Sequence, residues 1–167
     1  MESFVVKGKV WKFGNDVNTD VIYPGRFLNV TDPQESAKHC FEVVYPNFMK
    51  DAKAGDIIVA GKYFGCGSSR EQAAACLKNF GLAAVVAESF ARIYYRNAIN
   101  LGLPILICPE ISKKVEQGQE IEVNLREGIV KNLNTGKNIK AIPLPAFVLE
   151  MLESGGLIPH LKKKLKK

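Results

Sequence analysis

The sequence lacks the features that mark membrane, secreted and zinc-binding proteins. No apolar run approaches the ~20 residues that a helix needs to span a bilayer. The N-terminus carries the acidic Glu2 and a short apolar pair, not a basic segment before a long apolar core, so we expect no secretory signal. The cysteines form no C-x-x-C pair, which argues against a zinc or self-contained iron–sulfur site and indicates reduced thiols in the cytoplasm. They are Cys40, Cys66, Cys76 and Cys108.

Two phosphate-binding motifs are also absent. A dinucleotide fingerprint would place a third glycine at the position of Arg70. Around Gly61 and Lys62 the P-loop spacing is wrong, and Tyr63 stands where a serine or threonine would bind magnesium. The sequence therefore disfavours a nucleotide-dependent enzyme.

Positive charge is concentrated at the C-terminus. The net charge is +6, and the segment 162–167 supplies lysines without a compensating acid, so the rest of the chain is close to neutral. Such a tail can be an arm for nucleic acid or an anionic surface, or a solvated, frayed terminus. No aromatic residues interleave with these lysines, as a nucleic-acid platform would require, so we favour a frayed tail over residues 161–167 and expect neither nucleic acid nor membrane as a partner.

The middle of the chain alternates between strand and helix patterns. Uninterrupted apolar runs at 57–60, 83–87 and 104–108 are separated by helical patterns at 69–80 and 90–101. Strands of this kind imply a parallel sheet that helices cover on both faces. Ligands of such sheets bind at the carboxyl ends of the strands.

The flanking segments complete the fold prediction. An opening strand is expected at 5–13, and a helix at 32–41 in which Asp32 caps, Pro33 begins and Glu35 closes a capping box. Segments 120–125 and 129–133 alternate as an antiparallel hairpin. A closing helix at 144–152 follows, which Gly155 and Gly156 are expected to cap. We therefore predict an α/β fold in one domain spanning 1–167, with a parallel sheet layer, helices and an antiparallel hairpin layer.

The run Gly-Cys-Gly-Ser-Ser-Arg-Glu at 65–71 is the most informative motif. It joins an apolar strand to a helical pattern, an arrangement that points backbone N–H groups and a helix N-terminus at an anion. Ser68 and Ser69 also fit capping boxes with the acid or amide three residues on, so capping and an anion or catalytic site both remain open. Arg70 favours the anion site, because a cation in the first turn opposes the helix dipole.

Other candidates are less specific. Segment 16–27 is either an Asx-type turn or a second wall of the anion site, with Arg26 available. Arg92 and Arg96 share a helix face, and we favour acidic neighbours or a partner over substrate as their ligands. No histidine is near Cys66 in sequence, so a Cys–His nucleophile pair has little support.

Three blocks, at 16–28, 61–71 and 88–97 followed by Gly102-Leu103-Pro104, resemble the small subunits of isopropylmalate isomerases (3-isopropylmalate dehydratases) of the aconitase superfamily. The likeness covers nearly the whole chain. It implies a swivel-type β/β/α domain that works with a large subunit carrying a [4Fe–4S] cluster, and no metal ligands in this chain. The implied reaction is the dehydration and rehydration that converts 2-isopropylmalate to 3-isopropylmalate in leucine biosynthesis.

The resemblance also assigns roles to residues. Ser68 matches the catalytic base and Asp20 an acidic active-site residue, while Gly67, Ser69 and Arg70 match contacts to the substrate carboxylate. A free serine is too weak an acid to lose its proton at neutral pH, and the glycine turn, the helix N-terminus and Arg70 would stabilise the oxyanion.

The substrate class rests on one further position. Relatives that act on tricarboxylates carry an arginine shortly after the Phe27-Leu28 position, where this chain aligns Asn29. A neutral residue at this position suits an isopropyl group better than a carboxylate. If the loop shifts, however, Arg26 is close enough to take the place of the arginine that binds the extra carboxylate. We therefore expect Asn29 and Arg26 in the substrate site, with homoaconitate or another methyl-branched malate as the alternative. An RNA-binding regulator is the alternative of another class.

Overall fold

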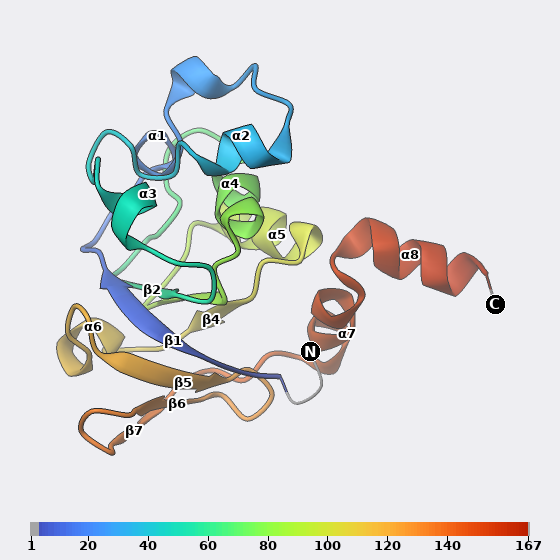
Figure 1. Ribbon diagram of the computed structural model, residues 1–167. Coiled ribbons are helices and arrows are strands. Elements are labelled where there is room, and N and C mark those ends of the chain that lie inside the picture. The colour runs from blue at the N-terminus through green and yellow to red at the C-terminus, as the bar shows by residue number, and fades with distance from the viewer. Residues whose placement is uncertain (1–3, 167) are drawn as a thin grey trace.

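The computed structural model describes residues 4–166 as one curved seven-stranded sheet with helices packed against it (Figure 1). In chain order the elements are β1 Val5–Lys12, α1 Thr19–Ile22, the short 3-10 helix η1 Gly25–Phe27, α2 Pro33–Ala37, α3 Phe48–Asp51, β2 Ile57–Ala60, α4 Gln72–Phe80, β3 Ala84–Ala87, α5 Arg92–Leu101, β4 Ile105–Ile107, α6 Ile111–Lys114, β5 Glu120–Asn124, β6 Ile129–Asn132, β7 Asn138–Lys140, α7 Ala146–Ser154 and α8 Leu157–Leu165.

Strand β1 joins the parallel and antiparallel halves of the sheet. The strand order is β4-β3-β2-β1-β5-β6-β7. The last part of β1 pairs parallel with β2 through Val10 and Ile57, and its first part pairs antiparallel with β5 through Val6 and Val123. Helices α4 and α5 lie over the parallel half, while β5, β6 and β7 lie below β1 in Figure 1. The α/β prediction is therefore confirmed, but the parallel and antiparallel parts are halves of one sheet and not separate layers. Strand β7 extends the predicted hairpin by one antiparallel strand.

Burial explains the apolar strands. Every side chain of β2 and β3 is buried, as uninterrupted apolar runs in a covered parallel sheet should be. The one buried acid beside them, Asp56, accepts a hydrogen bond from the Trp11 indole nitrogen at 2.9 Å and another from the Lys53 backbone at 2.9 Å. The core thus fixes the strands whose carboxyl ends carry the loops of the candidate site.

Several helix ends differ from the predictions. The helix that Asp32 caps, through a 3.1 Å bond to the Gln34 amide, ends at Ala37 and not at Phe41. Phe41 has a φ of +56° and its amide donates to the carbonyl of Ile22, so a tertiary contact ends the helix early. Glu35 pairs with Lys38 and does not close a capping box.

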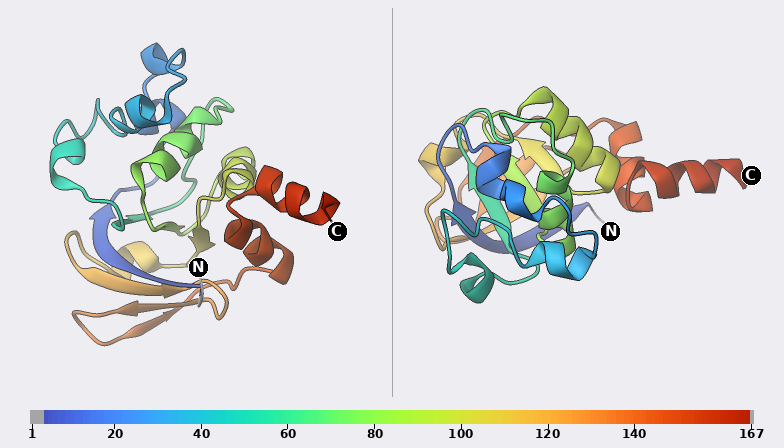
Figure 2. Two further views of the ribbon diagram at one scale, coloured as in Figure 1. Left: turned by 45° about the vertical axis from the view of Figure 1, so that its right-hand side comes forward. Right: turned by 90° about the horizontal axis from the view of Figure 1, so that it is seen from above.

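Helices α4 and α5 begin later than expected, at Gln72 and Arg92 instead of 69 and 90. The closing helix α7 ends at Gly155, which takes the left-handed conformation that the two glycines predicted. Helix α8 carries the basic tail as far as Leu165 and extends away from the body in both views of Figure 2, where we had expected a frayed end. Among the described residues, no helix is both long and apolar enough to cross a membrane.

Candidate active site

Two loops lie side by side at the carboxyl ends of the parallel strands. The loop after β1 and the loop after β2 form an isolated parallel bridge between Asn18 and Cys66. The Gly65 amide donates to the carbonyl of Val17 at 2.7 Å, and the Thr19 amide donates to the carbonyl of Cys66 at 2.9 Å. Segments far apart in sequence are therefore held as one surface at the carboxyl ends of the strands, where ligands of parallel sheets bind.

The loop after β3 makes the third side. The Phe64 amide donates to the Ser89 carbonyl at 3.1 Å, and the Ala91 amide donates to the Phe64 carbonyl at 2.9 Å. The Ser89 hydroxyl accepts from the Tyr63 amide at 2.8 Å and holds Tyr63 at a φ of +61°. Three consecutive strands thus supply three loops to one site.

Gly65 allows the close approach of the loop to helix α5. Its φ is +85°, and a Cβ atom there would lie 2.1 Å from Cγ of Tyr94. The Tyr94 side chain is buried beneath the loop, and its hydroxyl donates to the carbonyl of Ala73 in α4 at 3.1 Å. Burial raises the pKa of Tyr94 well above its usual value, so the hydroxyl keeps its proton and remains a donor. Only glycine fits this position without moving the ring.

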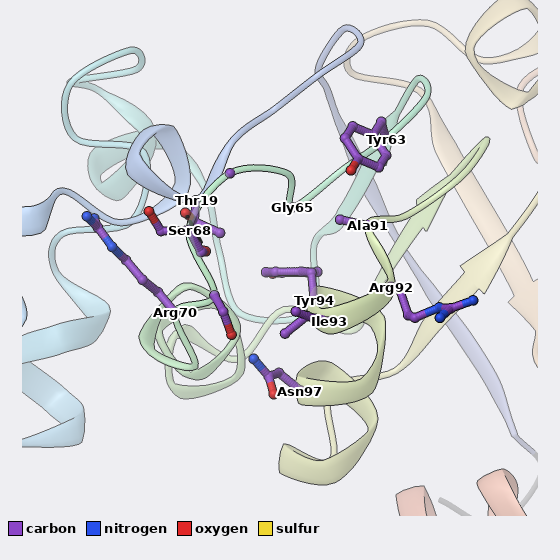
Figure 3. A pocket seen from close by; sticks show the side chains of 12 residues that line it. Thr19, Tyr63, Gly65, Ser68, Arg70, Ala91, Arg92, Ile93, Tyr94 and Asn97 are labelled. Carbon is purple, nitrogen blue, oxygen red and sulfur yellow. Dashed lines mark hydrogen bonds between the residues drawn. The ribbon is translucent and has the colours of Figure 1, made fainter.

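These loops enclose a cavity of about 230 Å³, shown in Figure 3. Its walls combine the serines and arginine of the motif with apolar and aromatic side chains from α5. The lining residues are Thr19, Tyr63, Gly65, Gly67, Ser68, Ser69, Arg70, Ala91, Arg92, Ile93, Tyr94 and Asn97. Of the sequence-predicted site residues, four from the motif therefore line one cavity: Gly67, Ser68, Ser69 and Arg70.

The motif loop offers unpaired hydrogen-bond donors. Among residues 4–166, the backbone N–H groups from Gly67 to Arg70 have no acceptor within hydrogen-bond distance, and Gly67, Ser68 and Ser69 are exposed. The Thr19 hydroxyl donates to the Ser68 carbonyl at 3.0 Å and fixes the loop from below. Consecutive free amides in a turn with a left-handed residue, here Gly67 at φ +91°, make a concavity that binds anions.

The serines do not cap helix α4. The helix begins at Gln72 after Glu71, and no side chain makes a capping bond there. The capping alternative for Ser68 and Ser69 is therefore wrong. The dipole of a helix acts mainly within its first turn, so the expected support of Ser68 by the helix N-terminus is weaker than the sequence suggested.

Arg70 forms an ion pair with Asp20, which lies in the first turn of α1. The Arg70 side chain is 23% exposed and that of Asp20 is 62% exposed, so the pair stands at the solvent edge, where it adds little stability. Gly25 also lies against the guanidinium, because a Cβ atom there would be 3.2 Å from its Nη1. The loop after β1 thus positions Arg70 from two sides.

The structure does not bring Arg26 and Asn29 into the cavity. Arg26 pairs with Glu42 at 3.2 Å and lies over the Phe27 ring at 4.8 Å, and Asn29 is exposed and lines no part of the cavity. His39 stacks on Phe27 with ring centroids 3.6 Å apart. No histidine among the described residues lines the cavity, and the hydroxyl-bearing residues that line it are Thr19, Tyr63, Ser68, Ser69 and Tyr94.

Sequence reasoning missed several wall residues. Thr19 falls inside the 16–27 segment, but its bond to Ser68 depends on pairing between two distant loops. Tyr63, Ile93 and Asn97 carry no motif of their own, and the left-handed backbone of Tyr63 has no sequence signal. Their place in the blocks 61–71 and 88–97, which carry the family resemblance, is the signal that could have indicated them.

The side chains that the structure describes do not fit an iron–sulfur cluster. Among residues 4–166, no three His, Cys, Asp or Glu side chains converge as metal ligands. Cys40, Cys76 and Cys108 are buried, and Cys66 is partly buried. Burial, and secondly the charge of Asp16, raise the pKa of the Cys66 thiol, which opposes the thiolate form that a metal requires.

The mixed parallel and antiparallel sheet, with the motif loop at the carboxyl ends of its parallel strands, defines an α/β domain. The family of aconitase C-terminal domains matches residues 12–111, more than half of the chain, and the chain belongs to that family. The family prediction is therefore confirmed.

Similar proteins carry more particular names. The 3-isopropylmalate dehydratase small subunit 1 of Methanopyrus kandleri is 55% identical over 160 residues, which are 96% of this chain and 94% of that protein. The isopropylmalate/citramalate isomerase small subunit of Methanocaldococcus jannaschii is 56% identical over 161 residues, 96% of each chain. The crystal structure of 3-isopropylmalate dehydratase from the same organism superposes with a TM-score of 0.90 at 46% identity, covering 96% of this chain and 95% of that one.

Proposed function

We propose that this chain is the small subunit of a 3-isopropylmalate dehydratase, a hydro-lyase of leucine biosynthesis that interconverts 2-isopropylmalate and 3-isopropylmalate. The relatives named as such subunits match over nearly their whole length. A larger subunit that carries a [4Fe–4S] cluster is the proposed partner, and the cytoplasm the proposed location. Because the side chains here do not fit a cluster, we assign it to that partner and derive no step through it.

The observation that carries the proposal is the loop of free amides, two hydroxyls and a guanidinium that lines one wall of the cavity. A hydroxy-dicarboxylate presents carboxylates, which such donors bind through charge-assisted hydrogen bonds. We assign Gly67, Ser69 and Arg70 to hold a substrate carboxylate. Asp20 orients the Arg70 guanidinium through their ion pair.

Ser68 is the proposed base. During dehydration its oxygen, as the alkoxide, takes the proton from the carbon next to the one that loses the hydroxyl, and during rehydration it returns a proton to carbon. The neighbouring unpaired amides stabilise the negative charge of the alkoxide. The Thr19 hydroxyl fixes the Ser68 carbonyl, so the oxygen of Ser68 is presented from a defined backbone position.

The cavity walls support a branched apolar substituent. Ala91, Ile93 and Tyr94 line the side that helix α5 supplies, opposite the serine loop in Figure 3. Arg26 and Asn29 lie outside the cavity here, and they remain candidates for the substrate site only if the loop after α1 moves. Citramalate is the second candidate substrate, because a relative at 56% identity bears an isopropylmalate/citramalate name. The names of the relatives give no support to homoaconitate or to RNA binding.

The test is anaerobic assay of this chain mixed with a cluster-loaded large subunit from the same source. With 2-isopropylmalate, we expect activity in the mixture and none with either subunit alone. Parallel reactions with citramalate and homoaconitate rank the substrates. A confirmed complex that turns over homoaconitate faster than isopropylmalate would overturn the substrate assignment, and one inactive on all three would overturn the proposed function.

A further inference from the structure

Arg92 and Arg96 are two exposed cations that the proposed reaction does not use. They stand four residues apart on helix α5 and therefore project from one face of it. Three kinds of ligand could explain such a pair: acidic neighbours in the chain, the substrate, or a protein partner. The structure distinguishes among them.

Acidic neighbours do not account for the pair. Among residues 4–166, neither guanidinium has a carboxylate within ion-pair distance, although Arg26 and Arg70 each have one. The substrate does not account for it either. Arg96 lines no part of the cavity, and the head of Arg92 points away from Ser68 and Arg70 in Figure 3.

Apolar side chains accompany the two arginines. Tyr63 is 53% exposed and Ile93 is 43% exposed, and both stand at the wall of the same cavity. Tyr63 holds its ring in solvent from a left-handed backbone that costs on the order of 1–3 kcal/mol in a non-glycine residue. Exposed tyrosine and arginine beside an apolar residue are the composition that marks the centre of protein interfaces.

We propose that Tyr63, Arg92, Ile93 and Arg96 form the docking surface for the large subunit, and that the matching face of that subunit is acidic with an apolar centre. This inference rests on the proposed function, which supplies the partner. Charge complementarity indicates the chemistry of the partner, because two exposed guanidinium groups without intrachain acids favour carboxylates on the surface that faces them. The surface borders the cavity, so docking there covers the mouth of the site and excludes water from it.

The test measures the affinity between the subunits, not activity alone. Arg96→Ala removes one charge from the surface without touching the cavity wall, and Lys131→Ala removes one charge from an exposed position on β6 as the matched control. Titration calorimetry with the cluster-loaded large subunit should show binding about tenfold weaker for Arg96→Ala, as loss of an interface arginine commonly gives. The control should bind as the wild type does. Raising the salt concentration should reduce the difference in affinity between Arg96→Ala and the wild type, because salt screens the charge.

Two further measurements separate this inference from the proposed function. At saturating large subunit, Arg96→Ala should turn over 2-isopropylmalate with unchanged kcat and KM. Ile93→Ala should also weaken binding to the large subunit, but the affinity of this variant should depend on salt concentration as the affinity of the wild type does. The docking surface would be overturned if Arg96→Ala, the control and the wild type bound the large subunit with equal affinity. It would also be overturned if Arg96→Ala raised the KM without changing that affinity, or if the wild-type chain bound no large subunit. A complex that forms as expected but acts on no tested substrate would overturn only the function.

Discussion

The two glycines of the motif loop allow a direct test of how the site is built. Both take left-handed backbone conformations, with φ of +85° at Gly65 and +91° at Gly67. Their surroundings differ. A Cβ atom at Gly65 would lie 2.1 Å from Cγ of Tyr94, whereas at Gly67 the nearest atom, Cβ of Asn18, would be 3.5 Å away. Substitution of each by alanine therefore separates backbone strain from steric overlap.

The expected losses of unfolding free energy follow from these distances. Gly67→Ala should lose about 1–2 kcal/mol, the usual strain of a left-handed residue that bears a Cβ. Gly65→Ala should lose roughly 2–5 kcal/mol, because overpacking against a buried ring adds about 1–3 kcal/mol. The Tyr94 ring cannot yield freely, since it is buried and its hydroxyl donates to the Ala73 carbonyl. Both substitutions restrict the unfolded chain equally, so that effect cancels in the difference.

Urea unfolding of the two variants and the wild type, monitored by circular dichroism, measures the losses. We expect the midpoint for Gly65→Ala to fall clearly below that for Gly67→Ala, with similar slopes. In a Tyr94→Ala background, where the ring is absent, Gly65→Ala should lower the free energy of unfolding by less than it does in the wild type. Equal losses for the two single variants would refute the claim that the loop is seated on Tyr94.

Three other predictions concern the chemistry of the chain. Ser68→Ala should abolish nearly all turnover of the reconstituted pair while subunit binding stays intact, and wild-type turnover in that variant would remove Ser68 as the base. Arg70→Lys should raise the KM about tenfold or more, because an ammonium cannot reproduce the bidentate fork, and an unchanged KM would exclude Arg70 from the substrate site. Burial raises the pKa of Cys108 to about 12, so iodoacetamide at pH 8 should modify Cys66 slowly and leave Cys108 unmodified until the chain unfolds, as mass spectrometry of peptides can check.

The strands could be predicted because each follows from a local apolar pattern. The runs that became β2 and β3 are apolar at every position, and both faces of that part of the sheet are covered. Helix beginnings could not be predicted as well. Arg70 and Glu71 have good helical propensity, yet the bond from Thr19 to Ser68 and the left-handed Gly67 hold them in a loop. Tertiary contacts of this kind are invisible to a local reading.

In the candidate site too, residues with a local sequence pattern could be predicted and residues placed by tertiary contacts could not. Ser68, Ser69 and Arg70 could be found because they are adjacent in a motif with its own chemistry. Their partner Asp20 was found only through the resemblance, since 50 residues separate it from Arg70 and their ion pair depends on the pairing of two loops. Arg26 lies outside the cavity because Glu42 and the Phe27 ring hold its guanidinium elsewhere, and no local pattern in the sequence shows that competition.

The late start of helix α4 changes the physical account of Ser68. Gln72, where the helix begins, lies four positions after Ser68, so the helix dipole contributes little at the Ser68 hydroxyl. Arg70 contributes less than an isolated cation would, because Asp20 already neutralises it. The unpaired loop amides are therefore the main groups left to stabilise the alkoxide, and water screens their field while the loop is exposed. Their field at the alkoxide becomes strong only when the surroundings lose water, and covering by the large subunit would do this. For the proposed base, these electrostatics give a physical reason why the reaction would require both subunits.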